Sequence, residues 1–100
     1  MKIDQIKDAR LEELIHRLVA QYISREASSQ SLITVTKVVV TDFGRSATIY
    51  ISVLPDKECR PALSFIEHRL SDIHEYVRDH SNLRVMPRLS VGLDPDLMVQ

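Results

Sequence analysis

The stretch ITVTKVVVTDFGRSATIYISVL, residues 33–54, decides the fold class of this chain. Its first part is rich in Val, Ile and Thr, the residue types that suit a pleated strand. Its second part, residues 46–54, alternates in a way that is typical of a strand with one buried face. Asp42 and Gly44 supply a turn between the two parts, because Asp bonds its own backbone and Gly accepts a positive φ. We therefore predict a β-hairpin whose inward-facing set in the second strand is Ala47, Ile49, Ile51 and Val53.

Helical patterns flank this hairpin on both sides. Apolar residues recur at three-to-four spacing over residues 4–26 and again over residues 61–80, which gives each helix one apolar stripe. Residues 83–93 alternate once more, and we predict a last strand there. Pro87 cannot donate to a ladder, so this strand either starts near Arg88 or has Pro87 on an edge. The prediction is an α+β fold, a three-stranded sheet with helices on one face.

Length and composition predict one domain over residues 1–94, followed by a short tail, residues 95–100, that we expect to be frayed. A single cysteine, Cys59, excludes an internal disulfide framework and fits a reducing cytosol. No apolar run approaches the roughly 18 residues of a membrane span, and the first residues lack the apolar core of a signal peptide. We therefore expect a cytoplasmic protein, a monomer without membrane contact.

The sequence carries no pattern typical of an enzyme. The chain has only two glycines, so no glycine-rich loop can cradle a nucleotide, and we expect no cofactor. The histidines are spaced too widely for a metal site and are expected at surface or boundary positions. An enzyme that uses the thiol of Cys59 is the weakest of the functional hypotheses.

Basic residues in the hairpin, at the end of the second helix and in the last strand are candidates for contacts with an RNA backbone. Arginine pairs with phosphate through a planar fork, and Arg84 and Arg88 are expected on one face of the last strand. The net charge of −1 favours the simpler alternative, isolated arginines on solvated faces. The candidate contacts are Lys37, Arg45, Arg78, Arg84 and Arg88.

Three segments of the chain resemble the ribosome-binding factor A family of bacteria. The first is the leading helix ARLEELIHRLVAQYI, residues 9–23. The second is the hairpin, residues 33–54, with its Asp-x-x-Arg turn. The third combines Tyr-Val-Arg at residues 76–78 with LRVMPRL at residues 83–89, closed by Asp94. The order and spacing of these segments carry the resemblance, which spans most of the chain.

The resemblance implies a KH-like fold of type II, with the order α-β-β-α-α-β. It also implies a non-catalytic assembly factor that binds the free small (30S) ribosomal subunit and 16S rRNA during late maturation and processing of the rRNA 5′ end. The family usually breaks its second helical unit at a glycine, and residues 71–75 contain none. The sequence therefore leaves open whether residues 61–80 form one straight helix or two.

A second hypothesis belongs to a different class. The near-zero net charge also suits a small α/β module that binds another protein, for example by pairing at an exposed strand edge, without any RNA.

Overall fold

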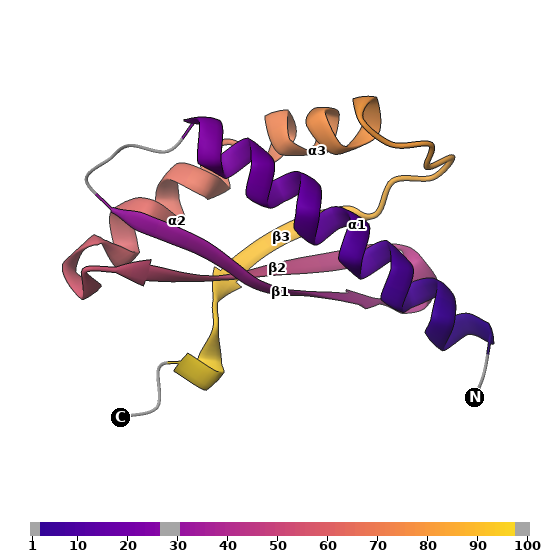
Figure 1. Cartoon of the computed structure of the whole chain (residues 1–100), viewed down its shortest axis with the longest axis horizontal. Coiled ribbons are helices and arrows are strands. Elements are labelled where there is room, and N and C mark those ends of the chain that lie inside the picture. The colour runs from indigo at the N-terminus through magenta and orange to yellow at the C-terminus, as the bar shows by residue number, and fades with distance from the viewer. Residues whose placement is uncertain (1–2, 27–30, 98–100) are drawn as a thin grey trace.

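The computed structural model describes residues 3–26 and 31–97. The helices and strands follow one another in the order α1 (Ile3–Glu26), β1 (Leu32–Thr41), β2 (Ser46–Leu54), α2 (Cys59–His68), α3 (Leu70–Asp79) and β3 (Arg88–Leu93) (Figure 1). Short 3₁₀ turns, η1 (Asp42–Gly44), η2 (Asp56–Glu58) and η3 (Pro95–Leu97), follow β1, β2 and β3. This order confirms the predicted α-β-β-α-α-β series.

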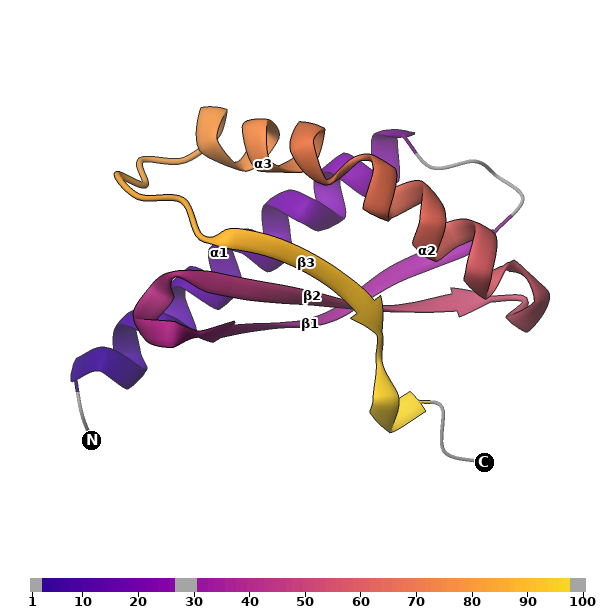
Figure 2. The ribbon, with the colours of Figure 1, turned by 180° about the vertical axis from the view of Figure 1, so that it is seen from behind.

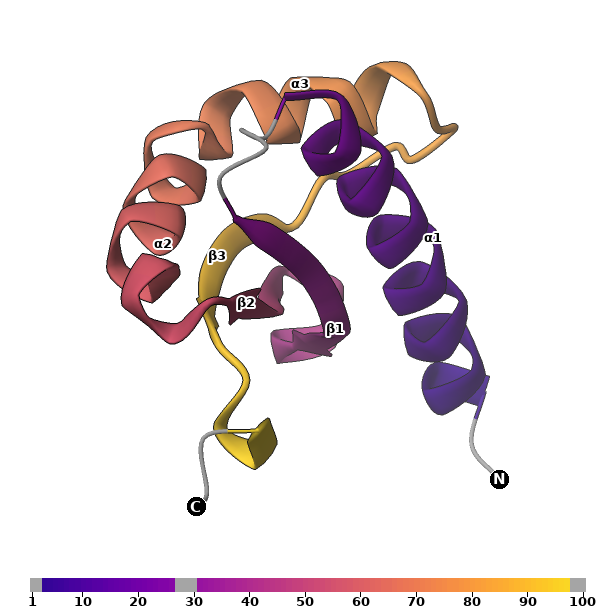
Figure 3. The same ribbon diagram turned by 60° about the vertical axis from the view of Figure 1, so that its left-hand side comes forward.

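The three strands form one mixed sheet in the order β1-β2-β3. β1 pairs with β2 in the antiparallel sense, and β3 joins the other edge of β2 in the parallel sense, from Ser46 opposite Arg88 to Ile51 opposite Leu93. The reverse view shows β3 and β2 running side by side beneath α2 and α3 (Figure 2). The three helices arch over one face of the sheet, as the turned view shows (Figure 3). This arrangement confirms the predicted α+β class.

A β-bulge in β1 explains how its valines reach the core. The register with β2 shifts between Val35 and Lys37, so Thr36 is an extra residue in the strand. A one-residue slip exchanges the two faces of a strand, and after the bulge Val38 and Val40 point inward while Lys37 lies on the open face. The chain's continuous Val-Val-Val run gave no sign of this shift.

The core lies between the helices and the covered face of the sheet. The alternation predicted for β2 is confirmed, since its apolar residues are nearly inaccessible and their neighbours are not. Among the described residues, no helix is long and apolar enough to cross a bilayer. The buried apolar residues are Ile15, Leu18, Val19, Tyr22, Ile23, Val35, Val38, Val40, Ala47, Ile49, Ile51, Val53, Ala62, Ile66, Ile73 and Val77.

The second helical unit is broken at Arg69, which separates α2 from α3 without any glycine. Arg69 has φ −106° and ψ 7°, a negative φ that every residue type tolerates. Its guanidinium holds this corner against α1, because Nη1 lies 3.5 Å from the Tyr22 hydroxyl and 3.6 Å from the Glu26 carboxylate. The bond to the Tyr22 hydroxyl is also the main cause that raises the pKa of Arg69. The question that the sequence left open is therefore answered in favour of two helices.

The last strand is shorter than residues 83–93, because β3 begins at Arg88, directly after Pro87. Its first ladder bond follows the proline, since the Arg88 amide donates to the Arg45 carbonyl at 2.8 Å. The expectation that Arg84 and Arg88 share a strand face was wrong, because Arg84 lies in the loop between α3 and β3. Pro87 has no amide hydrogen to continue the ladder past that point.

Left-handed backbone shapes the hairpin turn. The φ angles of Asp42, Phe43 and Gly44 are 54°, 55° and 85°. The role predicted for Gly44 is confirmed. Phe43 also adopts a positive φ, and this residue is 90% exposed. A residue other than glycine is strained at a positive φ. Phe43 therefore lowers the stability of the turn, and its exposed ring buries no apolar surface in return.

The segment after β3 folds back beside the sheet. The Asp94 amide donates to the Ile51 carbonyl at 2.9 Å, and the Asp96 amide donates to the Asp94 carboxylate at 2.9 Å. Residues 95–97 of the predicted tail form η3. Residues 98–100 lie outside the described residues.

Candidate nucleic-acid interface

Arg45 and Arg88 are the two predicted contact residues that the fold brings together. Arg45 follows the hairpin turn and Arg88 opens β3, and the two are joined by the hydrogen bond between the Arg88 amide and the Arg45 carbonyl. Both residues are exposed. Neither guanidinium forms an ion pair with any residue in the described part of the chain. The parallel pairing of β2 with β3 thus places two unneutralised cations side by side.

These arginines line an open depression of about 520 Å³ that reaches across to α3. Ser71 and His74 of α3 add a hydroxyl and an imidazole to its polar lining. Guanidinium, hydroxyl and imidazole N–H groups all donate hydrogen bonds that suit phosphate oxygens. The arrangement can therefore hold a phosphate group. Its apolar lining consists of Leu70, Met86, Pro87 and Leu89.

Lys37 lies elsewhere, on the open face of the sheet, and is already paired. Its Nζ donates to the Asp96 carboxylate at 3.1 Å and lies 5.2 Å from the centre of the Tyr50 ring. The hydrogen bond to Asp96 is the main cause that raises the pKa of Lys37. An external phosphate must compete with this carboxylate for the ammonium group, which makes Lys37 a weaker contact than a free cation.

Asp94 lies close to the Lys37–Asp96 pair, at the end of β3. It is the only buried charged residue in the described part of the chain, at 6% exposure. The nearby Thr36 hydroxyl is the main cause that lowers the pKa of Asp94, with further contributions from the Asp96 amide and the charge of Lys37. The Asp that closes the last strand therefore has a structural role, which is to hold the η3 turn by accepting the Asp96 amide at 2.9 Å.

Arg78 and Arg84 are not brought into the depression. Arg78 lies in the last turn of α3, where its Nε is 3.4 Å from the Asp79 carboxylate. Arg84 is exposed in the loop that leads to β3. Neither lines the depression that holds Arg45 and Arg88.

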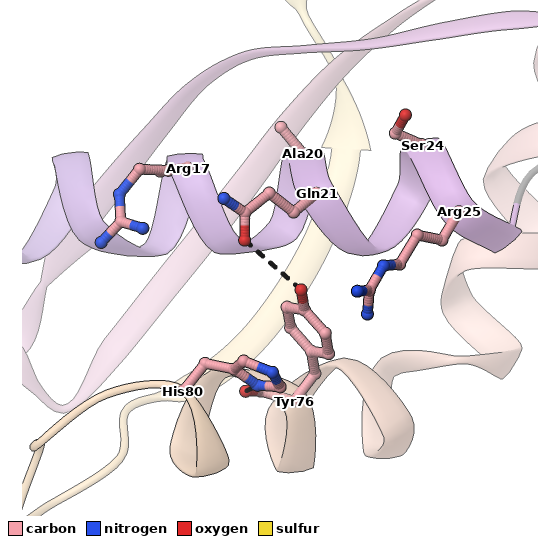
Figure 4. Close-up of a pocket in the computed structure, with 7 residues that line it drawn as sticks. All are labelled: Arg17, Ala20, Gln21, Ser24, Arg25, Tyr76 and His80. Atoms are coloured by element: carbon pink, nitrogen blue, oxygen red, sulfur yellow. Dashed lines mark hydrogen bonds between the residues drawn. The ribbon is translucent and has the colours of Figure 1, made fainter.

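A second polar surface, between α1 and α3, was missed by the sequence reasoning. We call it the α1–α3 surface and define it by Arg17, Gln21, Arg25, Tyr76 and His80, with Ala20 and Ser24 between them; together they line an open depression of about 740 Å³ (Figure 4). The Tyr76 hydroxyl donates to the Gln21 amide oxygen at 3.3 Å across the two helices.

The spacing of these residues contained a signal. The α1 members recur every four residues, which places them on one helix face, and Tyr76 and His80 are also four apart. Periodicity alone does not tell which polar faces of two helices meet. That relation depends on the break at Arg69, which turns α3 alongside α1 (Figure 3).

Metal ligands and the thiol of Cys59 are the other groups with distinctive chemistry in the described residues. No group of three His, Cys, Asp or Glu residues there could hold a metal ion. The Cys59 thiol is half-buried and lies 3.9 Å from the Val53 carbonyl oxygen, its hydrogen-bond acceptor. A small thiol in this setting packs as part of the fold.

Comparisons with known proteins point in one direction. The family model described as Ribosome-binding factor A matches residues 7–98. A curated ribosome-binding factor A of Bdellovibrio bacteriovorus is 32% identical over 89 residues, which cover 86% of this chain and 66% of that protein. The chain thus spans about two thirds of the length of this relative.

Two known structures show the same fold. The crystal structure of ribosome-binding factor A from Thermus thermophilus has a TM-score of 0.75 and 22% identity, covering 86% of this chain and 93% of that one. A homology model of the Thermus thermophilus factor, fitted into a cryo-electron microscopy map of its complex with 30S, has a TM-score of 0.72 and 21% identity, covering 83% of this chain and 90% of that one. At these identities the likeness establishes the fold, which is KH-like.

Proposed function

Because the chain belongs to the ribosome-binding factor A family, we propose that it binds the free small ribosomal subunit and its 16S rRNA. In this proposal it supports late maturation of the subunit and processing of the rRNA 5′ end, as a cytoplasmic monomer without a catalytic step. The fitted complex of the Thermus thermophilus factor with 30S supports the choice of partner. Residues 1–94 act as one binding domain.

The depression beside Arg45 and Arg88 is the observation that carries this proposal. It lies at the border of the sheet and α3, where the two arginines face His74 and Ser71. Neither arginine has an ion-pair partner in the described chain. A phosphate of the rRNA backbone receives both guanidinium forks there. Phosphate contacts of this kind position a protein on RNA without reading its sequence.

The remaining predicted contacts take secondary places. Arg84 is exposed on the loop that leads into Arg88, so it reaches a neighbouring phosphate of the same strand. Lys37 and Arg78 already have carboxylate partners, Asp96 and Asp79, and contribute less. Exposed ion pairs are weak, so both remain available at a reduced gain in affinity.

Sedimentation with purified ribosomal particles tests the proposal. The chain is mixed with small subunits, large subunits and 70S ribosomes, and the fraction that sediments with each is measured. We expect binding to free small subunits, weaker binding to 70S ribosomes, and loss of binding as salt rises. Equal binding to all three particles, or to none, contradicts the proposal.

A pull-down from cell lysate separates RNA binding from the protein-module hypothesis. The tagged chain is recovered with and without ribonuclease treatment. We expect 16S rRNA and small-subunit proteins to be lost together after the nuclease. A protein partner that remains bound without rRNA would instead support the interaction module.

A further inference from the structure

We propose that the α1–α3 surface is a second RNA contact, which binds a single-stranded segment by stacking one base on His80 and holding its phosphates with Arg17 and Arg25. This inference rests on the proposed function, since it names a further site for the same class of partner. It is separate from the depression at Arg45 and Arg88, with which it shares no residue.

The aromatic part of this surface is already ordered. The Tyr76 and His80 rings stack with their centroids 4.0 Å apart and their planes 24° apart. His80 Nδ1 lies 2.8 Å from the Tyr76 carbonyl oxygen, and Tyr76 packs edge-on against Tyr22 at 5.7 Å. His80 is exposed. A base that stacks on His80 extends a stack in which the rings of His80 and Tyr76 are already positioned. Little conformational freedom of these side chains is therefore lost on binding.

The charged part flanks the stack from α1. Arg25 lies 5.8 Å from the Tyr76 ring centre, on the side away from His80, while Arg17 lies toward His80 (Figure 4). Neither has an ion-pair partner in the described part of the chain. They are eight positions apart in α1, about 12 Å along the helix axis. The two cations therefore meet well-separated points of an extended anion.

Two acidic residues beside this surface, Glu26 and Asp79, contact other arginines. Glu26 is 3.6 Å from the Arg69 guanidinium, and Asp79 is 3.4 Å from Nε of Arg78. Gln21, between the two arginines on α1, is held by the Tyr76 hydroxyl, which donates to its amide oxygen at 3.3 Å (Figure 4). The surface thus presents open cations and a planar ring to the same space.

This combination favours single-stranded RNA over other anions. A duplex keeps its bases stacked internally and offers none to His80, because recognition of unpaired RNA depends on splayed bases. An acidic peptide satisfies Arg17 and Arg25 but brings no planar group to the ring. Stacking platforms with flanking cations are typical of sites for single strands.

The test measures binding of the full chain to a short fluorescein-labelled oligouridine by fluorescence anisotropy. We expect His80→Ala to weaken binding about fivefold or more, because base–aromatic stacking contributes at that level. His80→Phe keeps the ring and is expected to restore the affinity. Arg17→Ala also weakens binding and lowers its salt dependence, whereas Arg10→Ala, an exposed arginine elsewhere on α1, leaves the affinity within about twofold.

The Arg17 side chain forms no ion pair or cation–π contact with a described residue, so replacing it leaves the fold intact. The Arg17 variant therefore keeps the test informative even if a change at His80 disturbs Tyr76. Unchanged affinity in both His80→Ala and Arg17→Ala overturns the inference. Equal affinity for a duplex of the same length, or equal competition by polyglutamate, also overturns it and points to a different ligand.

The sedimentation experiment separates this inference from the proposed function. If the chain fails to bind small subunits but binds oligouridine with the expected variant pattern, the proposed function fails and the α1–α3 surface stands. If the chain binds small subunits and the oligouridine variants show no difference, the second contact alone fails.

Discussion

The backbone amide of Val40 donates a 2.8 Å hydrogen bond to the carboxylate of Glu12, and this bond joins α1 to strand β1. β1 has a neighbour in the sheet on one side only. A free strand edge is a place where another chain can pair. Here the Glu12 side chain already binds the Val40 amide, one of the donors on this edge. The edge of β1 is therefore less available for pairing with another protein, as the protein-module hypothesis would need.

Replacing Glu12 should weaken the fold. Glu12→Ala leaves the partly buried Val40 amide without its partner, and the loss is expected to be about 1–3 kcal/mol in the free energy of unfolding. Urea unfolding followed by circular dichroism measures it. The control is Glu13→Ala, an exposed neighbour that should change stability by less than about 0.5 kcal/mol. Similar losses in both variants would show that the hydrogen bond has no special part.

The strained hairpin turn offers a stabilising substitution. Phe43→Asn keeps the φ of 55° but uses a residue that tolerates the left-handed region, and no apolar burial is lost because Phe43 is 90% exposed. We expect a gain of about 0.5–1 kcal/mol in thermal or urea unfolding. Phe43→Ala removes the ring but keeps the unfavourable backbone, so it should change stability little. A gain in the alanine variant would assign the effect to the exposed ring instead.

Gly44 gives the opposite test at the same turn. A Cβ added there meets no atom within 4 Å, yet φ is 85°. Gly44→Ala is therefore expected to destabilise the chain by about 1 kcal/mol through backbone strain alone. Gly92 is the natural comparison, because it has no positive φ and a Cβ there would lie 3.9 Å from the Tyr50 ring, an ordinary contact. Gly92→Ala should cost less than Gly44→Ala.

Asp94 should make stability depend on acidic pH. Its pKa is lowered from 3.8 in the folded chain, so the folded state holds the proton less readily than the unfolded state. The stabilisation is present above the unfolded pKa of 3.8 and is lost as the pH falls through the folded pKa. Urea midpoints across this range should fall more steeply for the native chain than for Asp94→Asn. Parallel curves for the two chains would contradict the role given to Asp94.

The phosphate contacts should be visible in salt dependence. For binding to small subunits, Arg88→Ala should reduce the slope of log affinity against log salt by about one. Lys37→Ala should reduce it less, because Asp96 already competes for that ammonium group. Arg60→Ala, an exposed arginine at the start of α2, serves as the control with an unchanged slope. Equal slopes for Arg88→Ala and Arg60→Ala would remove Arg88 from the interface.

Much of the fold followed from local patterns in the sequence. The alternation over residues 46–54 placed β2 and its buried face correctly, and the apolar stripe of residues 4–26 placed α1 against it. The bulge at Thr36 and the break at Arg69 did not follow, because both depend on partners distant in the sequence. Tyr22 and Glu26 of α1 hold Arg69 in place, and no local window contains all three.

The candidate site was predictable only in part. Arg45 and Arg88 were both proposed, but their adjacency depends on the parallel pairing of Ser46 with Arg88, which spans 42 residues. Alternation over residues 83–93 wrongly placed Arg84 on a strand, because Pro87 prevents the ladder from extending back that far. The pairing of Tyr76 with Gln21 joins two helices through a single long-range bond and leaves no local trace.

The parallel attachment of β3 has a consequence for how the molecule is made. The β1–β2 hairpin closes through contacts near in sequence, and such contacts form early. The cationic pair at Arg45 and Arg88 exists only after the chain has passed through α2 and α3 and returned to the edge of β2. A nascent chain that ends before residue 88 contains every buried apolar residue named above and the whole hairpin, but only one of the two arginines. The phosphate site proposed above is thus complete only once β3 has paired with β2.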